Sequence, residues 1–326
     1  MSSAMLQRKY DPYVYCEGEG NDLTIMTIYV DDGLICCRHR SKLQNITEYL
    51  KKCFEMTFGP VDSYVGIQIT RDQSLGTIKL TQTNYINRIL RRFDLTDCNT
   101  RKVPADPFTH YSRNTDNTEP IQQPFREAIG SLMFAALCTR PDISFAVNQI
   151  SQFSSNPTQV HWNAIKLIFA YLKGTINHGI SYHRSADLTL LAYTDADYAG
   201  NLDDRKSTSG AVFTLTGGPV AWFCQRQHCI ALSTTEAEYI AASVASKEIT
   251  WLRGLLDDLG VKQRNPTQLM CDNQSAIKLV RNPEFHQRTK HIDVRYHYIR
   301  QQQEQNVLTM TYVKTELQLA DILTNN

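Results

Sequence analysis

Four acidic residues, far apart in the sequence, have the types and local settings of a metal-binding catalytic site: Asp195, Glu238, Asp272 and Asp321. Asp195 and Asp272 each end a strand-like stretch, and α/β proteins usually place their sites at the rim where strands end. Four converging carboxylates would repel one another and take up protons unless divalent cations neutralised them. Such a cluster would suit hard, oxygen-seeking Mg²⁺ or Mn²⁺.

Other acidic residues compete for the same role. An aspartate at a strand end, or a glutamate near a helix N-terminus, is often structural. Asp197, Asp203, Asp204 and Glu236 lie close enough in the sequence to be ligands instead. Periodicity does not decide between Glu236 and Glu238. Only the tertiary structure could bring the members of the set together, since nothing local does.

The part of the chain that carries these residues has the pattern of an α/β layer unit, beginning near residue 187. Strand-like runs come first, followed by a long helix, and strands and helices then alternate. The expected strands are 189–194, 210–215, 220–224, 229–232, 268–271 and 308–313. The expected helices are 235–259, 273–280, 294–303 and a helical turn near 317–323.

The preceding part of the chain has a different order of elements. Residues 23–37 predict a β-hairpin with Asp31 and Asp32 at its tip. A helix over 41–54 follows, with Ser41 as its N-cap. Beyond it, the patterns predict a hairpin of 64–70 with 77–80, a helix at 83–93, a proline-rich linker at 102–124, two helices within 125–153 separated at Arg140-Pro141, and a helix at 162–173.

Composition narrows the class of protein. The 326 residues suggest about two domains, and 42% hydrophobic residues are ample for a core. A net charge of +1 argues against a strongly basic coat, although it does not exclude a local patch. The apolar runs are too short to span a bilayer and the N-terminus lacks a signal-peptide core, so we expect an intracellular protein. The nine cysteines form no CxxC pair and are expected to be reduced.

Six motifs resemble, in their order, the ribonuclease H domain of copia-like retrotransposon Pol polyproteins. They are YTDADYAG at 193–200, DRKSTSG at 204–210, STTEAEYIA at 233–241, CDNQSAI at 271–277, RTKHID at 288–293 and QLADILT at 318–324. The resemblance assigns the catalytic and metal-ligating roles to Asp195, Glu238, Asp272 and Asp321, and it sets Glu236 aside. It implies two Mg²⁺ or Mn²⁺ ions and hydrolysis of the RNA strand of RNA/DNA hybrids.

The resemblance extends upstream of these motifs. Residues 29–32, YVDD, resemble the family's reverse-transcriptase active-site turn, and residues 125–175 resemble its thumb and connection segments. The implied fold is a ribonuclease H-like mixed sheet flanked by helices, preceded by a partial reverse-transcriptase palm with a helical thumb and connection. The implied domains are 1–80 (partial palm), 81–186 (thumb and connection, with the linker 102–124) and 187–326 (ribonuclease H-like).

The polymerase part is expected to be inactive alone. The family's polymerase needs a further metal-binding Asp and a fingers region, and only thirty residues precede Asp31. Asp31 and Asp32 are therefore interpreted as a polymerase remnant.

Recognition of a hybrid is expected to rest on phosphates and ribose hydroxyls rather than on base edges. The basic stretch 281–300 is the local patch that the net charge conceals, although a solvated helix face is the competing interpretation. The candidate contacts are Arg205, Lys206, Ser207, Thr208, Arg288, Lys290 and His291.

The expected partners are an RNA/DNA hybrid and other retroelement Pol or Gag chains, with no membrane. The expected locations are the cytoplasm, in a virus-like particle, and the nucleus. The alternative function is a non-catalytic nucleic-acid-binding relic or domesticated module that keeps the fold without turnover.

Overall fold

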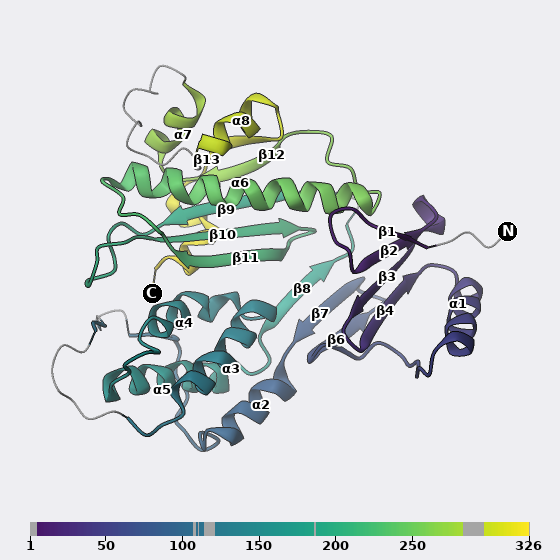
Figure 1. Cartoon of the computed structure of the whole chain (residues 1–326), viewed down its shortest axis with the longest axis horizontal. Helices are drawn as coiled ribbons and strands as arrows, with labels where there is room; N and C mark the ends of the chain where they lie inside the picture. The colour runs from purple at the N-terminus through teal and green to yellow at the C-terminus, as the bar shows by residue number, and fades with distance from the viewer. Residues whose placement is uncertain are drawn as a thin grey trace.

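The computed structural model of the chain describes residues 5–106, 109, 111–113, 121–185, 187–282 and 297–325. Three β-sheets and the helices around them make up this part of the molecule (Figure 1). None of the described helices is both long and apolar enough to cross a membrane.

The first sheet is antiparallel and contains the hairpin that the sequence predicts. Its strands, in spatial order, are β1 (Leu6–Gln7), β2 (Val14–Glu17), β3 (Thr24–Tyr29) and β4 (Asp32–Cys37), with the short helix η1 (Gly20–Asp22) between β2 and β3. Helix α1 (Arg40–Cys53) follows β4. Its N-cap is His39 rather than Ser41, and the cap has no side-chain hydrogen bond, so the Ser41 prediction is wrong.

The second sheet joins segments that lie about a hundred residues apart. It is antiparallel, with the order β5 (Ser63–Tyr64), β6 (Ile67–Asp72), β7 (Thr77–Thr81) and β8 (Gly179–His183). Strand β8 was not predicted, although Ile180 and Tyr182 alternate with polar residues as in a half-buried strand; Ile180 is its only buried residue. The pairing of β7 with β8 ties the two sides of the expected boundary at residue 80 into one sheet.

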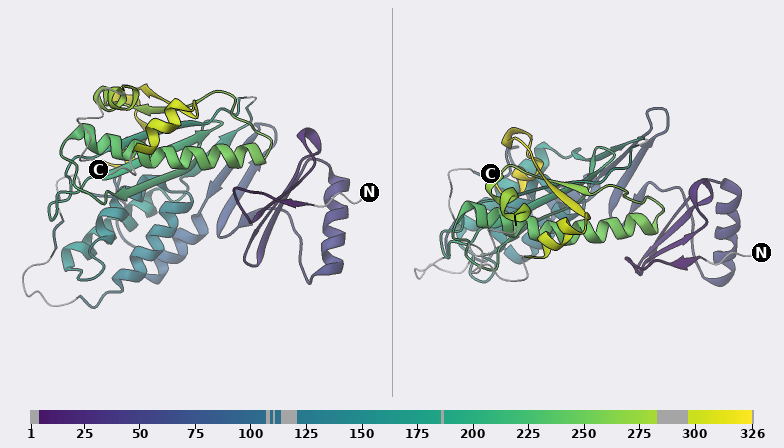
Figure 2. Two further views of the ribbon diagram at one scale, coloured as in Figure 1. Left: turned by 45° about the horizontal axis from the view of Figure 1, so that its top comes forward. Right: turned by 90° about the horizontal axis from the view of Figure 1, so that it is seen from above.

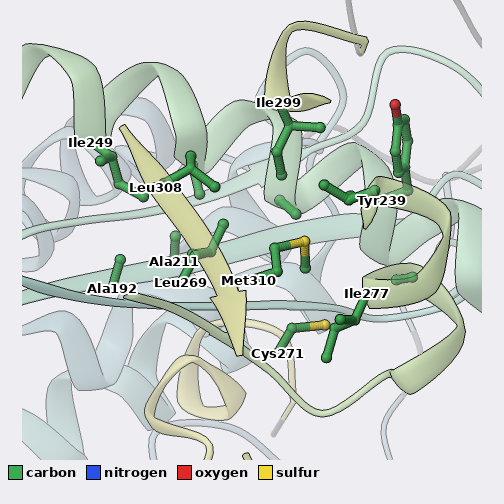
Figure 3. Close-up of a cluster of buried hydrophobic side chains, with 14 of the residues drawn as sticks. Ala192, Ala211, Tyr239, Ile249, Leu269, Cys271, Ile277, Ile299, Leu308 and Met310 are labelled. Carbon is green, nitrogen blue, oxygen red and sulfur yellow. The ribbon is translucent and has the colours of Figure 1, made fainter. Parts of the chain in front are cut away.

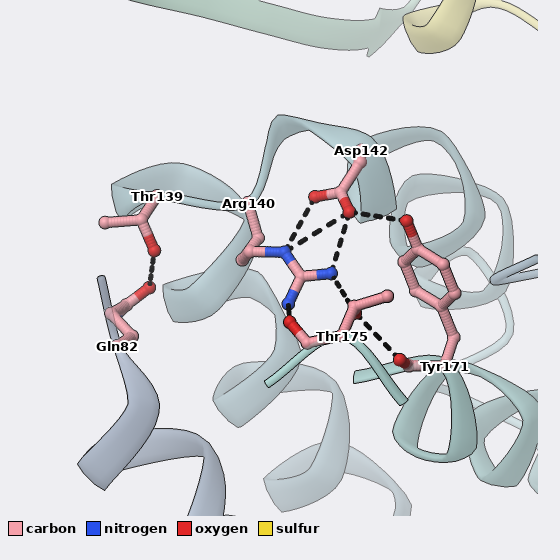
Figure 4. Close-up of polar contacts among 6 residues, drawn as sticks. All are labelled: Gln82, Thr139, Arg140, Asp142, Tyr171 and Thr175. Atoms are coloured by element: carbon pink, nitrogen blue, oxygen red, sulfur yellow. Dashed lines mark hydrogen bonds and ion pairs between the residues drawn. The ribbon is translucent and has the colours of Figure 1, made fainter. Parts of the chain in front are cut away.

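A helical layer lies between β7 and β8 in the sequence and has a core of its own. Its elements are α2 (Thr83–Arg92), α3 (Phe125–Cys138), η2 (Pro141–Ile143), α4 (Ser144–Ser151) and α5 (Gln159–Gly174). The predicted break at Arg140-Pro141 is confirmed. The Arg140 side chain, 1% exposed, bonds to Asp142 and Thr175, and the Tyr171 hydroxyl donates to Asp142 at 2.7 Å (Figure 4). This network fixes the turn between α3 and α4.

The third sheet is mixed, as expected. Its order is β11 (Gly218–Arg226), β10 (Thr208–Leu215), β9 (Leu191–Ala196), β12 (Thr267–Cys271) and β13 (Leu308–Tyr312). Strand β10 pairs antiparallel with β9 and β11, whereas β12 is parallel to both β9 and β13. The central strand β9 therefore ends at the same edge of the sheet as β12.

Helices cover the third sheet and bury its core. They are α6 (Thr234–Asp258), α7 (Gln274–Arg281), α8 (Tyr298–Glu304) and the short helices η5 (Thr315–Leu317) and η6 (Leu319–Leu323). Ala192, Leu269 and Met310 pack from the strands against Tyr239 and Ile249 of α6 (Figure 3). This core holds β9 and α6 in a fixed relation. It therefore also fixes the positions of side chains where the end of β9 meets the start of α6.

The predicted strand at 229–232 is wrong. The segment is an irregular connection into α6, and the backbone N–H of Leu232 donates to Glu236 Oε2 at 3.0 Å instead of joining a strand ladder. Ile230 and Leu232 are exposed while Ala231 is buried, so the apolar run that suggested a strand is a connection without strand pairing.

Candidate active site

The structure brings the four predicted carboxylates to one end of the third sheet. Asp195 lies in β9, Asp272 directly follows β12, Glu238 lies near the start of α6 and Asp321 lies in η6. Asp195 and Glu238 are each 6% exposed, and Asp272 and Asp321 are half-buried. The parallel pairing of β9 with β12 brings Asp195 and Asp272 together, because both strands end at the same edge, and the packing of α6 and η6 against the sheet adds Glu238 and Asp321.

The electrostatics of this cluster are those of a site built for cations. Burial, together with the negative charges of Asp195 and Asp272, raises the pKa of Glu238 to about 10. Burial also raises the pKa of Asp195. A hydrogen bond joins the carboxyl groups of Asp195 and Glu238, because the raised pKa of Glu238 lets it keep the proton that it donates. Divalent cations would replace that proton and neutralise the repulsion.

The donor atoms fit a divalent cation. Ligand atoms of Glu238, Cys271 and Asp272 lie within 4.8 Å of one another. The carboxylate oxygens suit Mg²⁺ or Mn²⁺, and the number of acidic groups matches a site that holds more than one positive charge. Cys271 is the third member of this group, but burial raises the pKa of its thiol well above the ordinary value, and a protonated thiol is a poor ligand for a hard cation. The Cys271 Sγ lies 3.9 Å from Glu238 Oε2, and the position of Cys271 directly before Asp272 was the available signal in the sequence.

The competing acidic residues have structural partners. Glu236 accepts from the Leu232 N–H, and its own backbone N–H donates to the N-cap side chain of Ser233 at 3.2 Å. This arrangement caps α6 and satisfies N–H groups that a helix start leaves without partners. Asp197 accepts the backbone N–H of Thr208.

Asp203 and Asp204 belong to the loop between β9 and β10. Asp203 accepts the backbone N–H of Arg113 at 3.0 Å, and Asp204 pairs with Arg226. Neither contributes to the clusters of potential metal ligands that the described residues contain.

The candidate substrate contacts fall into three groups. Arg205 is exposed and Lys206 half-buried on the loop before β10. Ser207 and Thr208 are buried, and Ser207 Oγ accepts the Ala199 N–H at 3.0 Å, so these two side chains support the loop instead of facing solvent. Arg288, Lys290 and His291 lie outside the described residues.

Both ends of the basic stretch 281–300 have structural contacts. Arg281 donates to the Met310 carbonyl. Arg300 is 6% exposed and lies over the Tyr239 ring, 5.4 Å from its centroid. These two arginines therefore stabilise the core of the third sheet.

Asp31 and Asp32 lie at the exposed tip of the β3–β4 hairpin, in another part of the molecule. Val30 at the same turn has φ +52° and is 80% exposed. Within the described residues, neither aspartate belongs to a group of three or more potential metal ligands.

Comparison with known proteins places this architecture in a family. A family model described as "Reverse transcriptase (RNA-dependent DNA polymerase)" matches residues 4–107. The chain is 40% identical over 331 residues to the "Retrovirus-related Pol polyprotein from transposon TNT 1-94" of Nicotiana tabacum, a match that covers 99% of this chain and 25% of that protein. It is 31% identical to the "Putative transposon Ty5-1 protein YCL074W" of Saccharomyces cerevisiae, covering 69% of this chain and 73% of that protein. The chain belongs to the family of retrovirus-related Pol polyproteins of transposons.

This Pol chain spans about a quarter of the length of its tobacco relative. Among solved structures, it is similar to the N-terminal RNase H domain of Rv2228c from Mycobacterium tuberculosis, solved as a fusion with maltose binding protein. That match has 12% identity and a TM-score of 0.30, and it covers 42% of this chain and 91% of that one.

Proposed function

We propose that this Pol chain is a metal-dependent endonuclease that hydrolyses the RNA strand of RNA/DNA hybrids. The observation that carries the proposal is the convergence of Asp195, Glu238, Asp272 and Asp321 at the shared end of β9 and β12. The order of the motifs that contain them, and membership of the Pol family, support the same activity.

The four carboxylates would hold Mg²⁺ or Mn²⁺ at this end of the sheet. Two bound ions would lower the pKa of an attacking water and neutralise charge on the phosphate and the leaving oxygen. Asp195, in the central strand of the sheet and close to Glu238, Asp272 and Asp321, would be one of the residues that hold these ions. The carboxylates would hold the ions in place. Because water is the attacking group, the reaction would form no covalent bond between the enzyme and its substrate.

Substrate binding would come from the loop before β10. Arg205 and Lys206 would contact phosphates of the hybrid, and the buried Ser207 would hold the loop in place through its bond to the Ala199 N–H. Phosphate contacts position a duplex without reading its sequence. We therefore expect cleavage with little sequence preference, reduced by added salt.

Cleavage of a labelled RNA/DNA hybrid in the presence of Mg²⁺ tests the proposal, with a matched pair of glutamate variants. Glu238→Gln removes a ligand charge and should lower kcat at least about 100-fold. Glu236→Gln lies two residues away and keeps an acceptor for the Leu232 N–H, so its rate should stay close to that of the wild type. Asp272→Asn should behave like Glu238→Gln.

The outcomes test the assignment of the site and the choice between the two candidate functions separately. Equal rates for Glu238→Gln and Glu236→Gln would contradict the assignment of the site. A wild-type chain that binds the hybrid without cutting it would overturn the nuclease proposal and establish the alternative, a non-catalytic nucleic-acid-binding module.

We further propose that this chain alone does not extend primers. Asp31 and Asp32 have no third carboxylate beside them among the described residues, and polymerase chemistry of this family's kind needs one. Primer extension on a homopolymer template with the purified chain should give no product. Robust incorporation of nucleotides would refute this proposal.

A further inference from the structure

Residues 315–325, the C-terminal segment, donate a hydrogen bond to three of the four carboxylates. The donor and acceptor pairs are Thr324 to Asp195, Thr315 to Asp272 and Asn325 to Asp321. Only Glu238 is not contacted in this way by the described part of the segment. One short stretch of chain thus touches carboxylates from β9, from the end of β12 and from η6.

The three bonds differ in how easily water could replace them. Thr324 is 1% exposed and Asp195 6%, so this bond is shielded from solvent. Thr315 and Asn325 are exposed, and water can take over part of their role. The segment is also fastened beside Asp195, because the buried Gln318 donates through Nε2 to the Thr194 carbonyl at 2.9 Å.

We propose that Thr324 is a positioning residue, whose hydroxyl fixes the orientation of the Asp195 carboxylate for holding divalent cations. The inference rests on the proposed nuclease function. The terminal torsion of an aspartate is broad and roughly two-fold, so a free carboxylate samples many orientations. A hydroxyl bonded to Oδ2 selects one of them and directs the remaining lone pairs. Carboxylates that bind metals are commonly held by such outer hydrogen bonds.

The test compares variants of the full chain that differ by the hydroxyl. Thr324→Val removes the hydroxyl and keeps the shape, whereas Thr324→Ser keeps the hydroxyl. We expect Thr324→Val to weaken Mg²⁺ binding, measured by calorimetry without substrate, by about 10- to 100-fold. The Mg²⁺ concentration needed for cleavage should rise in parallel, while KM for the hybrid stays unchanged. Thr324→Ser should restore most of the affinity.

Three further variants make the test decisive. Thr324→Ser and Thr324→Ala differ only by the hydroxyl, so this pair decides the matter if the valine variant does not fold. Thr315→Val should have a smaller effect than Thr324→Val, because its bond is exposed. Thr250→Val is the control, since that hydroxyl, twelve residues beyond Glu238 in α6, donates to Ser246 O at 3.0 Å and accepts from the Tyr298 hydroxyl at 3.2 Å. It should leave Mg²⁺ binding unchanged.

The outcomes separate this inference from the function on which it rests. Equal Mg²⁺ affinity in the valine, serine and alanine variants, in a chain that cleaves hybrids, would overturn the positioning role and leave the nuclease intact. Loss of Mg²⁺ affinity without the hydroxyl, in a chain that never cleaves hybrids, would support the positioning role and overturn the nuclease.

Discussion

Asp197 shows what burial does to a single carboxylate beside the candidate active site. It follows β9, and its side chain accepts the backbone N–H of Thr208 while its own N–H donates to the Thr208 carbonyl at 3.1 Å. Burial, which outweighs the hydrogen bond from Thr208, raises the pKa of Asp197 to about 6. The residue therefore fixes the start of β10 but keeps its proton over a wider pH range than an exposed aspartate.

Replacing this aspartate should remove a pH dependence of stability. The unfolded pKa is about 3.9, so between pH 4 and 6 the folded protein binds more protons at Asp197 than the unfolded chain does. The contribution of Asp197 to the free energy of unfolding thus falls as pH rises through that window. Asp197→Asn keeps an acceptor and does not titrate. The free energy of unfolding of the variant minus that of the wild type, measured with urea, should therefore increase by about 1–3 kcal/mol between pH 4 and pH 7. A difference that does not change with pH would contradict this.

At the scale of elements, the position of η6 depends on a glycine in a central strand. Gly210 of β10 lies opposite Asp195 of β9 in the strand register. A Cβ at this glycine would lie 2.8 Å from Leu323 Cβ and 2.9 Å from Thr324 Cγ2. Glycine inside a strand often marks the close approach of another segment. Here it lets the helix that carries Asp321 lie directly against the sheet.

Gly210→Ala should therefore impair the site through the packing of η6. The added methyl group must push Leu323 and Thr324 away, and a small displacement of η6 moves both Asp321 and the hydroxyl that bonds Asp195. We expect Mg²⁺ affinity to fall by about tenfold or more, measured by calorimetry. Gly130→Ala is the matched control, since a Cβ there meets no atom within 4 Å and alanine favours its helix, α3. Unchanged Mg²⁺ binding in the Gly210→Ala variant would show that η6 is not held by this contact.

At the scale of the whole molecule, the N-terminal sheet is docked on the far end of α6 (Figure 2). The Tyr10 ring packs against Gly254, where a Cβ would lie 2.2 Å from Tyr10 Cε1. Trp251 Nε1 donates to the Tyr10 carbonyl at 2.9 Å, and Asp258 accepts the Tyr10 N–H at 3.1 Å. The helix that carries Glu238 at its start thus holds the first sheet at its other end.

Gly254→Ala should release this contact. The new methyl group occupies the place of the Tyr10 ring, so hydrogen exchange should increase in residues 8–15 and the fluorescence of Trp251 should change. In a Tyr10→Ala background the same substitution meets no ring, and alanine should then stabilise α6 by about 0.5–1 kcal/mol. An additive effect of the two substitutions on the free energy of unfolding would argue against direct packing.

Local patterns in the sequence predict the elements that carry a strong period, and the motifs identify the family. The β3–β4 hairpin, the helices α2, α5 and α6 and the break at Arg140-Pro141 all follow from spacing and from proline. Strand β8 and the irregular segment at 229–232 did not follow, because their state depends on which backbone groups pair across the fold. The candidate site divides in the same way. The acidic residues could be named from their motifs. The bonds from Thr324 to Asp195 and from Thr315 to Asp272 span 129 and 43 positions of the sequence, and they form only where β9, β12 and the C-terminal short helices meet.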